Sequence, residues 1–178
     1  MVTDAGKSKI FSEDTSSLHL RRDDRNVCVR RLKEIALQFE CLELGLREYL
    51  QTALKLVRER VHDLLPFHYT VGELNVPLGQ LHENFLKFSD DKELKDRIGD
   101  LVKRRNNVMH KAHLLVFASQ LIDHPNFDGV TWAKEIEGLS TLLAEAAGCN
   151  NLLHDRIQEL EKMAFSRKIV AEIGRAHV

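Results

Sequence analysis

Apolar residues recur at steps of three or four along most of this chain, the spacing that places side chains on one face of an α-helix. The first run begins after an arginine- and aspartate-rich stretch near Asp23, where we place the start of a helix. Pro66 closes this helix, because proline disfavours helical backbone in the residue before it. Gly45 is a candidate position for a bend in so long a helix. The apolar members of the run are Leu32, Ile35, Phe39, Leu42, Leu46, Tyr49, Ala53, Val57 and Val61.

Two further helical runs follow, and each begins at a helix-start signal. Pro77 suits the first position of a helix that reaches about Phe88. The sequence Ser89-Asp90-Asp91 then offers an N-cap for a helix that we expect to end near Ile122. The segment from His124 to Gly129 contains proline, asparagine, aspartate and glycine, which predicts a turn.

The last run alternates steps of four and three, which is a heptad pattern and predicts long packing along neighbouring helices. Asn150 is its one polar member. Asn150 either sets the register against a partner helix or lies at the edge of a seam that bends near Gly148, and we favour the edge. The members of this seam are Trp132, Ile136, Leu139, Leu143, Ala146, Asn150, Leu153, Ile157, Leu160 and Ala164.

These runs predict an all-α protein, an up-down, mostly antiparallel bundle of four to five helices. Alternation typical of a strand is weak and confined to residues 67–71. Residues 1–17 show no periodicity, so we interpret them as a flexible N-terminal arm. Residues 18–178 are long enough for a single helical-bundle domain.

Composition narrows the possible functions. The 26 basic and 27 acidic residues give a net charge of −1, so any nucleic-acid site must be local. The three cysteines lie far apart without a C-x-x-C pair, which argues against a zinc finger and suits a reducing, cytoplasmic setting. No secretory signal is visible, and the longest apolar run, residues 114–118, is too short to span a membrane.

Cofactor and metal motifs are missing as well. The sequence contains neither a glycine-rich phosphate loop nor a G-x-S-x-G motif. His110 and His113 are three residues apart and could touch one metal ion, but no third ligand is fixed by the sequence. We therefore expect no cofactor and no metal.

One cluster inside the third predicted helix carries unusual chemistry. Residues 103–111 include four basic side chains and a histidine. At 100° per residue, Asn106 and His110 share a face, whereas Arg105 lies about 140° from His110 around the helix axis. Arg105 must therefore curl, or a helix deformation or a neighbouring chain must help, before both side chains reach one point.

The segment Arg105-Asn106-Asn107-Val108-Met109-His110, with Leu101 and Val102 upstream, resembles the Arg-x4-6-His motif of HEPN domains (higher-eukaryote and prokaryote nucleotide-binding). The long first helix and the stretch Thr70-Val71-Gly72-Glu73-Leu74 are similar to some prokaryotic members. The resemblance implies a metal-independent endoribonuclease that acts as a homodimer. It further implies a toxin or anti-phage defence protein, with a cognate nucleotidyltransferase-like antitoxin as a possible partner.

On this resemblance, Arg105, Asn106 and His110 are the catalytic residues. RNA carries its own nucleophile, the 2′-hydroxyl, and a histidine can act on it as base or acid near neutral pH. An arginine stabilises charge on phosphate oxygens, and Asn106 would orient His110 or hold the phosphate. Lys103, Arg104 and Lys111 would bind the RNA backbone.

The alternative is a non-catalytic module for helical dimerisation, protein interaction, or RNA or nucleotide binding. Arg105 and His110 would then be exposed, or paired with carboxylates such as Asp100 or Glu83. The two hypotheses differ in geometry. Catalysis requires Arg105 and His110 to face a shared, basic groove and to approach the same residues of a second copy.

Overall fold

The computed structural model describes residues 10–61, 74–122, 124 and 126–176, and side chains from residue 26 to residue 165. Four helices make up this part of the chain: α1 (Ile10–Val61), α2 (Leu78–Phe88), α3 (Lys92–Gln120) and α4 (Gly129–Ala176). No strand occurs among the described residues, which confirms the predicted all-α class. The strand candidate at 67–71 lies outside them.

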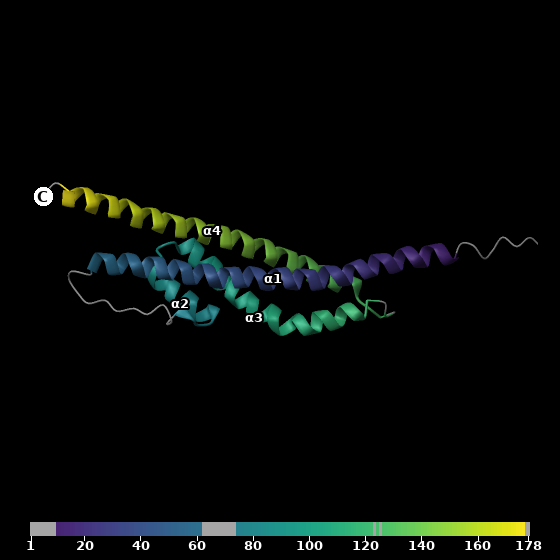
Figure 1. Cartoon of the computed structure of the whole chain (residues 1–178). Helices are drawn as coiled ribbons and strands as arrows, with labels where there is room; N and C mark the ends of the chain where they lie inside the picture. The colour runs from purple at the N-terminus through teal and green to yellow at the C-terminus, as the bar shows by residue number, and fades with distance from the viewer. Residues whose placement is uncertain (1–9, 62–73, 123, 125, 177–178) are drawn as a thin grey trace, which may run out of the picture.

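The three long helices alternate in direction. Figure 1 shows α1 and α4 side by side along much of their length, and α3 packs against both of these helices and against α2. Gln38 meets Asn150 and Gly45 meets Leu153, so α1 and α4 run parallel to each other. Asp91, just before α3, pairs with Arg156 of α4, and Arg104 within α3 pairs with Glu145 of α4. Because the later residue of the α3 region meets the earlier residue of α4, the two helices run antiparallel. This is the up-down order predicted, with α1 and α4 as its parallel first and last members.

The first helix begins earlier than the sequence pattern suggested. Helix α1 starts at Ile10 rather than near Asp23, so only residues 1–9 of the predicted arm lie outside the described residues. Between Ile10 and Gly45 the sequence contains neither proline nor glycine, the two residues that most disfavour helix. The serines and threonine at 12–17 weaken a helix by only tenths of a kcal/mol each, roughly, which is too little to end it.

The predicted apolar faces form the core. Members of the first run from Leu32 to Ala53 are buried, and Val57 and Val61 are half-buried. The seam of α4 contributes Trp132, Leu139, Ala146, Leu153 and Ile157 to the same core. The heptad pattern therefore marks the side of α4 that packs on α1, as predicted.

Two residues explain how closely α1 and α4 approach. A Cβ atom at Gly45 would lie 2.9 Å from Cδ2 of buried Leu153, so glycine allows close packing of α1 against α4 there. Asn150 Nδ2 donates to the Gln38 carbonyl oxygen at 2.9 Å and to Gln38 Oε1 at 2.8 Å. Asn150 thus bonds across the pair, and its half-buried side chain is compatible with the predicted place at the seam edge.

Helix α3, which carries the histidine motif, is anchored at its start. Asp91 is the N-cap, with Oδ1 accepting from the Leu94 backbone N–H at 3.0 Å, as the Ser-Asp-Asp sequence predicted. Pro77 was predicted as the first residue of a helix, but it is the N-cap residue of α2, which begins at Leu78. No described helix contains an apolar stretch long enough to cross a bilayer.

Candidate functional site

The predicted catalytic residues lie in the middle of α3. The core-facing side of this helix is marked by Leu94, Ile98, Leu101, Leu115 and Ser119, which are buried. Asn106 and His110 lie on the opposite side and are exposed. The structure therefore brings these two residues onto one solvent-facing surface, one helical turn apart.

Arg105 lies on a different side of α3. Its side chain is half-buried, and its Nε–H is buried without a hydrogen-bond acceptor in the described part of the protein. Five residues of regular helix separate it from His110, a rotation of about 140°. Within one chain, the helix does not place the guanidinium beside the imidazole.

The predicted RNA-binding cations differ in their surroundings. Arg104 forms an ion pair with Glu145 of α4, and Lys103 Nζ lies 3.3 Å from Asp100 Oδ1. Lys111 lines a pocket instead. Because two of the three cations already have carboxylate partners, the positive charge of the cluster is partly neutralised.

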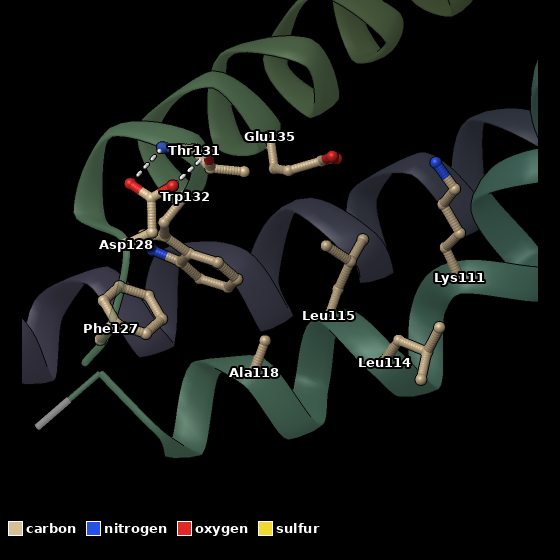
Figure 2. Close-up of a pocket in the computed structure, with 9 residues that line it drawn as sticks. All are labelled: Lys111, Leu114, Leu115, Ala118, Phe127, Asp128, Thr131, Trp132 and Glu135. Atoms are coloured by element: carbon tan, nitrogen blue, oxygen red, sulfur yellow. Dashed lines mark hydrogen bonds between the residues drawn. The ribbon is translucent and has the colours of Figure 1, made fainter. Parts of the chain in front are cut away.

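That pocket was not predicted from the sequence. It has a volume of about 370 Å³ and lies between the C-terminal half of α3, the connection that follows it and the first turns of α4 (Figure 2). Apolar side chains form most of its wall, with charged residues at the edge. The lining residues are Lys111, Leu114, Leu115, Ala118, Phe127, Asp128, Thr131, Trp132 and Glu135.

Local hydrogen bonds shape the α4 side of the pocket. Asp128 Oδ1 accepts from the backbone N–H groups of Val130 and Thr131, both at 3.1 Å, and its Oδ2 accepts from the Thr131 hydroxyl at 2.6 Å. The Thr131 hydroxyl, followed by these backbone bonds, lowers the pKa of the Asp128 carboxyl. Asp128 is thus a helix cap, which its position just before α4 could have indicated.

Aromatic packing forms the inner wall. Phe127 meets Trp132 edge-to-face, with ring centroids 5.8 Å apart. The Trp132 indole N–H is buried and has no acceptor among the described residues. Lys111 and Glu135 extend from α3 and α4 on the same side of this wall, without forming an ion pair with each other (Figure 2).

The exposed side of α3 also carries large apolar side chains. Leu114 and Phe117 follow His110 at steps of four and three, so these three residues share one face of α3. Leu121, the C-cap residue after α3, is exposed as well. Val130, next to pocket residue Thr131, is exposed as well. Sequence spacing alone places Leu114 and Phe117 on the motif face, and the structure adds that they are exposed there.

No group of three or more possible metal ligands occurs in the described part of the chain. Comparisons of the chain with models of protein families, with curated proteins and with solved structures found no match. The functional argument therefore rests on the residues themselves.

Proposed function

We propose that this protein is a metal-independent endoribonuclease of the HEPN type, with a composite site formed by two copies of the chain. The observation that supports it best is the placement of Asn106 and His110. Both are exposed on one face of α3. No hydrogen bond or ion pair within the described residues occupies them.

The chemistry follows from the side chains available. A histidine acting as base takes the proton of the ribose 2′-hydroxyl, and the 2′-oxygen attacks the adjacent phosphorus. The bond from phosphorus to the 5′-oxygen breaks, and a protonated histidine delivers a proton to that leaving oxygen. In a symmetric pair, His110 of each copy supplies one of these two roles. The products are a 2′,3′-cyclic phosphate and a free 5′-hydroxyl.

Arg105 is the reason for requiring two copies. Within one chain, a phosphate bound beside His110 would lie on the other side of α3 from Arg105. Arg105 from the second copy can instead approach it, where its planar guanidinium stabilises charge on the phosphate oxygens.

The proposed biological setting follows from the family resemblance alone. A ribonuclease of this type would act in a toxin–antitoxin or anti-phage system, restrained by a nucleotidyltransferase-like antitoxin. RNA, a second copy of the chain and such an antitoxin are then its partners.

A second candidate is a helical dimerisation or interaction module without catalysis. The separation of Arg105 from His110 around α3 favours it, because residues that do not meet cannot act on one phosphate. The ion pairs of Lys103 and Arg104 with carboxylates also fit an ordinary solvated helix surface.

An RNA-cleavage assay in EDTA distinguishes the two candidates. Wild type is compared with His110→Ala, Arg105→Ala and the matched control His113→Ala, which removes another exposed histidine of α3. We expect His110→Ala to cleave at least about 10²-fold more slowly, and Arg105→Ala to be similarly impaired. His113→Ala should retain wild-type activity.

The products report the mechanism. A 2′,3′-cyclic phosphate end, formed equally well with EDTA, supports attack by the 2′-hydroxyl without metal. Equal cleavage by wild type and His110→Ala would reveal a contaminant. Folded wild-type protein that cleaves no RNA from a transcript pool would favour the interaction module.

A further inference from the structure

The pocket between α3 and α4 has two chemically different ends. Lys111 and Glu135 lie towards one end, and Phe127 and Trp132 form the wall at the other (Figure 2). Ala118 lines the apolar end and follows Lys111 by two helical turns, so the pocket extends about 10 Å along α3. A small molecule that fills this pocket must therefore be charged or polar at one end and apolar at the other.

The apolar end suits an aromatic or branched side chain. Leu115 and Trp132 are only 8% and 7% exposed, so both are held by the core behind them. The volume of the pocket is about 370 Å³. Pockets that bind small molecules measure about 300–1,000 Å³, and a cavity of about 150 Å³ already accommodates benzene. One aromatic ring therefore fits beside Trp132 with room for the rest of its molecule.

The charged end selects against most apolar ligands. Lys111 and Glu135 carry opposite charges, and neither forms an ion pair within the described part of the chain. A ligand with a carboxylate alone is attracted by Lys111 and repelled by Glu135, and an amine alone experiences the reverse. A ligand that carries both charges at one end is attracted by both side chains.

We propose that this pocket binds a free α-amino acid with an aromatic or large apolar side chain. The side chain occupies the apolar end, the α-carboxylate pairs with Lys111 and the α-ammonium pairs with Glu135. An aromatic amino acid measures roughly 7 Å from its charged groups to the far carbon of its ring, which fits the length of the pocket. The ligand is thus complementary to the pocket in size, in charge and in the order of its parts.

This site is separate from the motif face of α3. Lys111 directly follows His110, so the two side chains point about 100° apart around the helix. Neither Asn106 nor Arg105 lines the pocket. The inference goes beyond the proposed ribonuclease function and does not depend on it, because binding is measured without RNA. A wild-type protein that binds the amino acid but cleaves no RNA would refute only the ribonuclease proposal.

The test titrates the full chain with L-phenylalanine near neutral pH. Trp132 is the only tryptophan and lines the pocket, so its emission reports occupancy. We expect a saturating change with a dissociation constant of about 0.1–1 mM, ordinary for a ligand of about a dozen heavy atoms. Saturation-transfer NMR on the ring protons of phenylalanine provides a second readout that does not rely on Trp132.

Three analogues of phenylalanine test the two ends of the pocket separately. Glycine lacks the side chain, phenethylamine lacks the carboxylate and phenylpropionate lacks the ammonium group. Each should bind at least about 5-fold more weakly than phenylalanine, because each loses contacts at one end.

Charge exchange at the rim provides matched variants. Lys111→Glu and Glu135→Lys each place two like charges there, and each should weaken phenylalanine binding by about 10-fold or more. The double variant restores one cation and one anion and should bind within about threefold of wild type, with the ligand's charged groups exchanged. Lys134→Glu is the control, because Lys134 is exposed beside Glu135 but does not line the pocket.

The outcomes are decisive in both directions. Neither a change in Trp132 emission nor saturation transfer up to about 20 mM phenylalanine would overturn the inference. So would an unchanged affinity of Lys111→Glu for phenylalanine, or an analogue that binds as tightly as phenylalanine itself. Loss of binding in both single variants and its recovery in the double variant supports the site, since misfolding would not be reversed by a second substitution. Circular dichroism confirms that each variant keeps its helices.

Discussion

Replacement of Asp91 tests how α3 is held in place. One carboxylate connects two helices, α3 and α4. Its Oδ1 caps α3 by accepting from the Leu94 N–H at 3.0 Å, and its Oδ2 accepts from Arg156 of α4, at 3.0 Å from Nε and 2.8 Å from Nη2. Asp91→Ala removes both the cap and the ion pair, and should therefore loosen the start of the helix that carries His110.

The two contributions differ in size. Loss of an N-cap side chain costs about 1 kcal/mol. The Arg156 pair adds less, about 0.5 kcal/mol, because Arg156 is 46% exposed and keeps Glu159 as a partner. We expect Asp91→Ala to lower the free energy of unfolding by about 1.5 kcal/mol. Asp91→Asn, which retains a capping oxygen but not the charge, should lose only about 0.5 kcal/mol.

Urea unfolding followed by circular dichroism measures both variants against wild type. An Asp91→Ala protein within about 0.3 kcal/mol of wild type would refute the capping argument. An Asp91→Asn protein as unstable as Asp91→Ala would show that the charge, not the cap, dominates.

The same residue predicts a pH dependence. The Leu94 N–H, and then Arg156, lower the pKa of the Asp91 carboxyl from its usual 3.8. A carboxyl with a lowered pKa stabilises the folded state above its unfolded-state pKa and loses that stabilisation as pH falls through the folded value. The stability difference between wild type and Asp91→Ala should therefore be constant near neutral pH and shrink below about pH 4. A difference that stays unchanged down to pH 2 would contradict this assignment.

Two further predictions concern burial. Leu46→Ala should lower the free energy of unfolding by about 3 kcal/mol, because Leu46 is fully buried, whereas Leu44→Ala, at a 61% exposed position, should stay within about 0.5 kcal/mol of wild type; equal losses in urea unfolding would contradict the assigned core face. Among the three cysteines, only exposed Cys41 should react quickly with a thiol reagent at pH 8, because burial raises the pKa of Cys28 and raises that of Cys149 to about 11. Rapid labelling of all three thiols in folded protein would contradict that arrangement.

Local sequence signals predicted the helices and the N-cap of α3. The three- and four-residue spacing from Leu32 to Ala53 corresponds to a buried face of α1, because helical periodicity is a property of neighbouring residues alone. Asp91 was recognisable as a cap for the same reason. The start of α1 was placed too late because weak helix formers do not end a helix when no glycine or proline follows them.

The candidate site was predictable only in part. Spacing alone places Asn106 and His110 on one face of α3 and Arg105 on another, and the structure adds that the first face is exposed. The apolar pocket had no signal in the sequence. Trp132 fits the predicted seam of the last helix, and only the packing of α3 against the start of α4 leaves a recess between Trp132 and Leu114.

The sequence by itself therefore determined which segments are helical, where α3 is capped and which residues share a face, since these depend on contacts within a few residues. Only the tertiary structure decided that α1 and α4 run parallel, that Asn150 bonds to Gln38 and that Phe117 faces solvent. Those features depend on which surfaces meet across more than a hundred residues. A helical pattern marks an apolar face, but whether that face is buried depends on what packs against it.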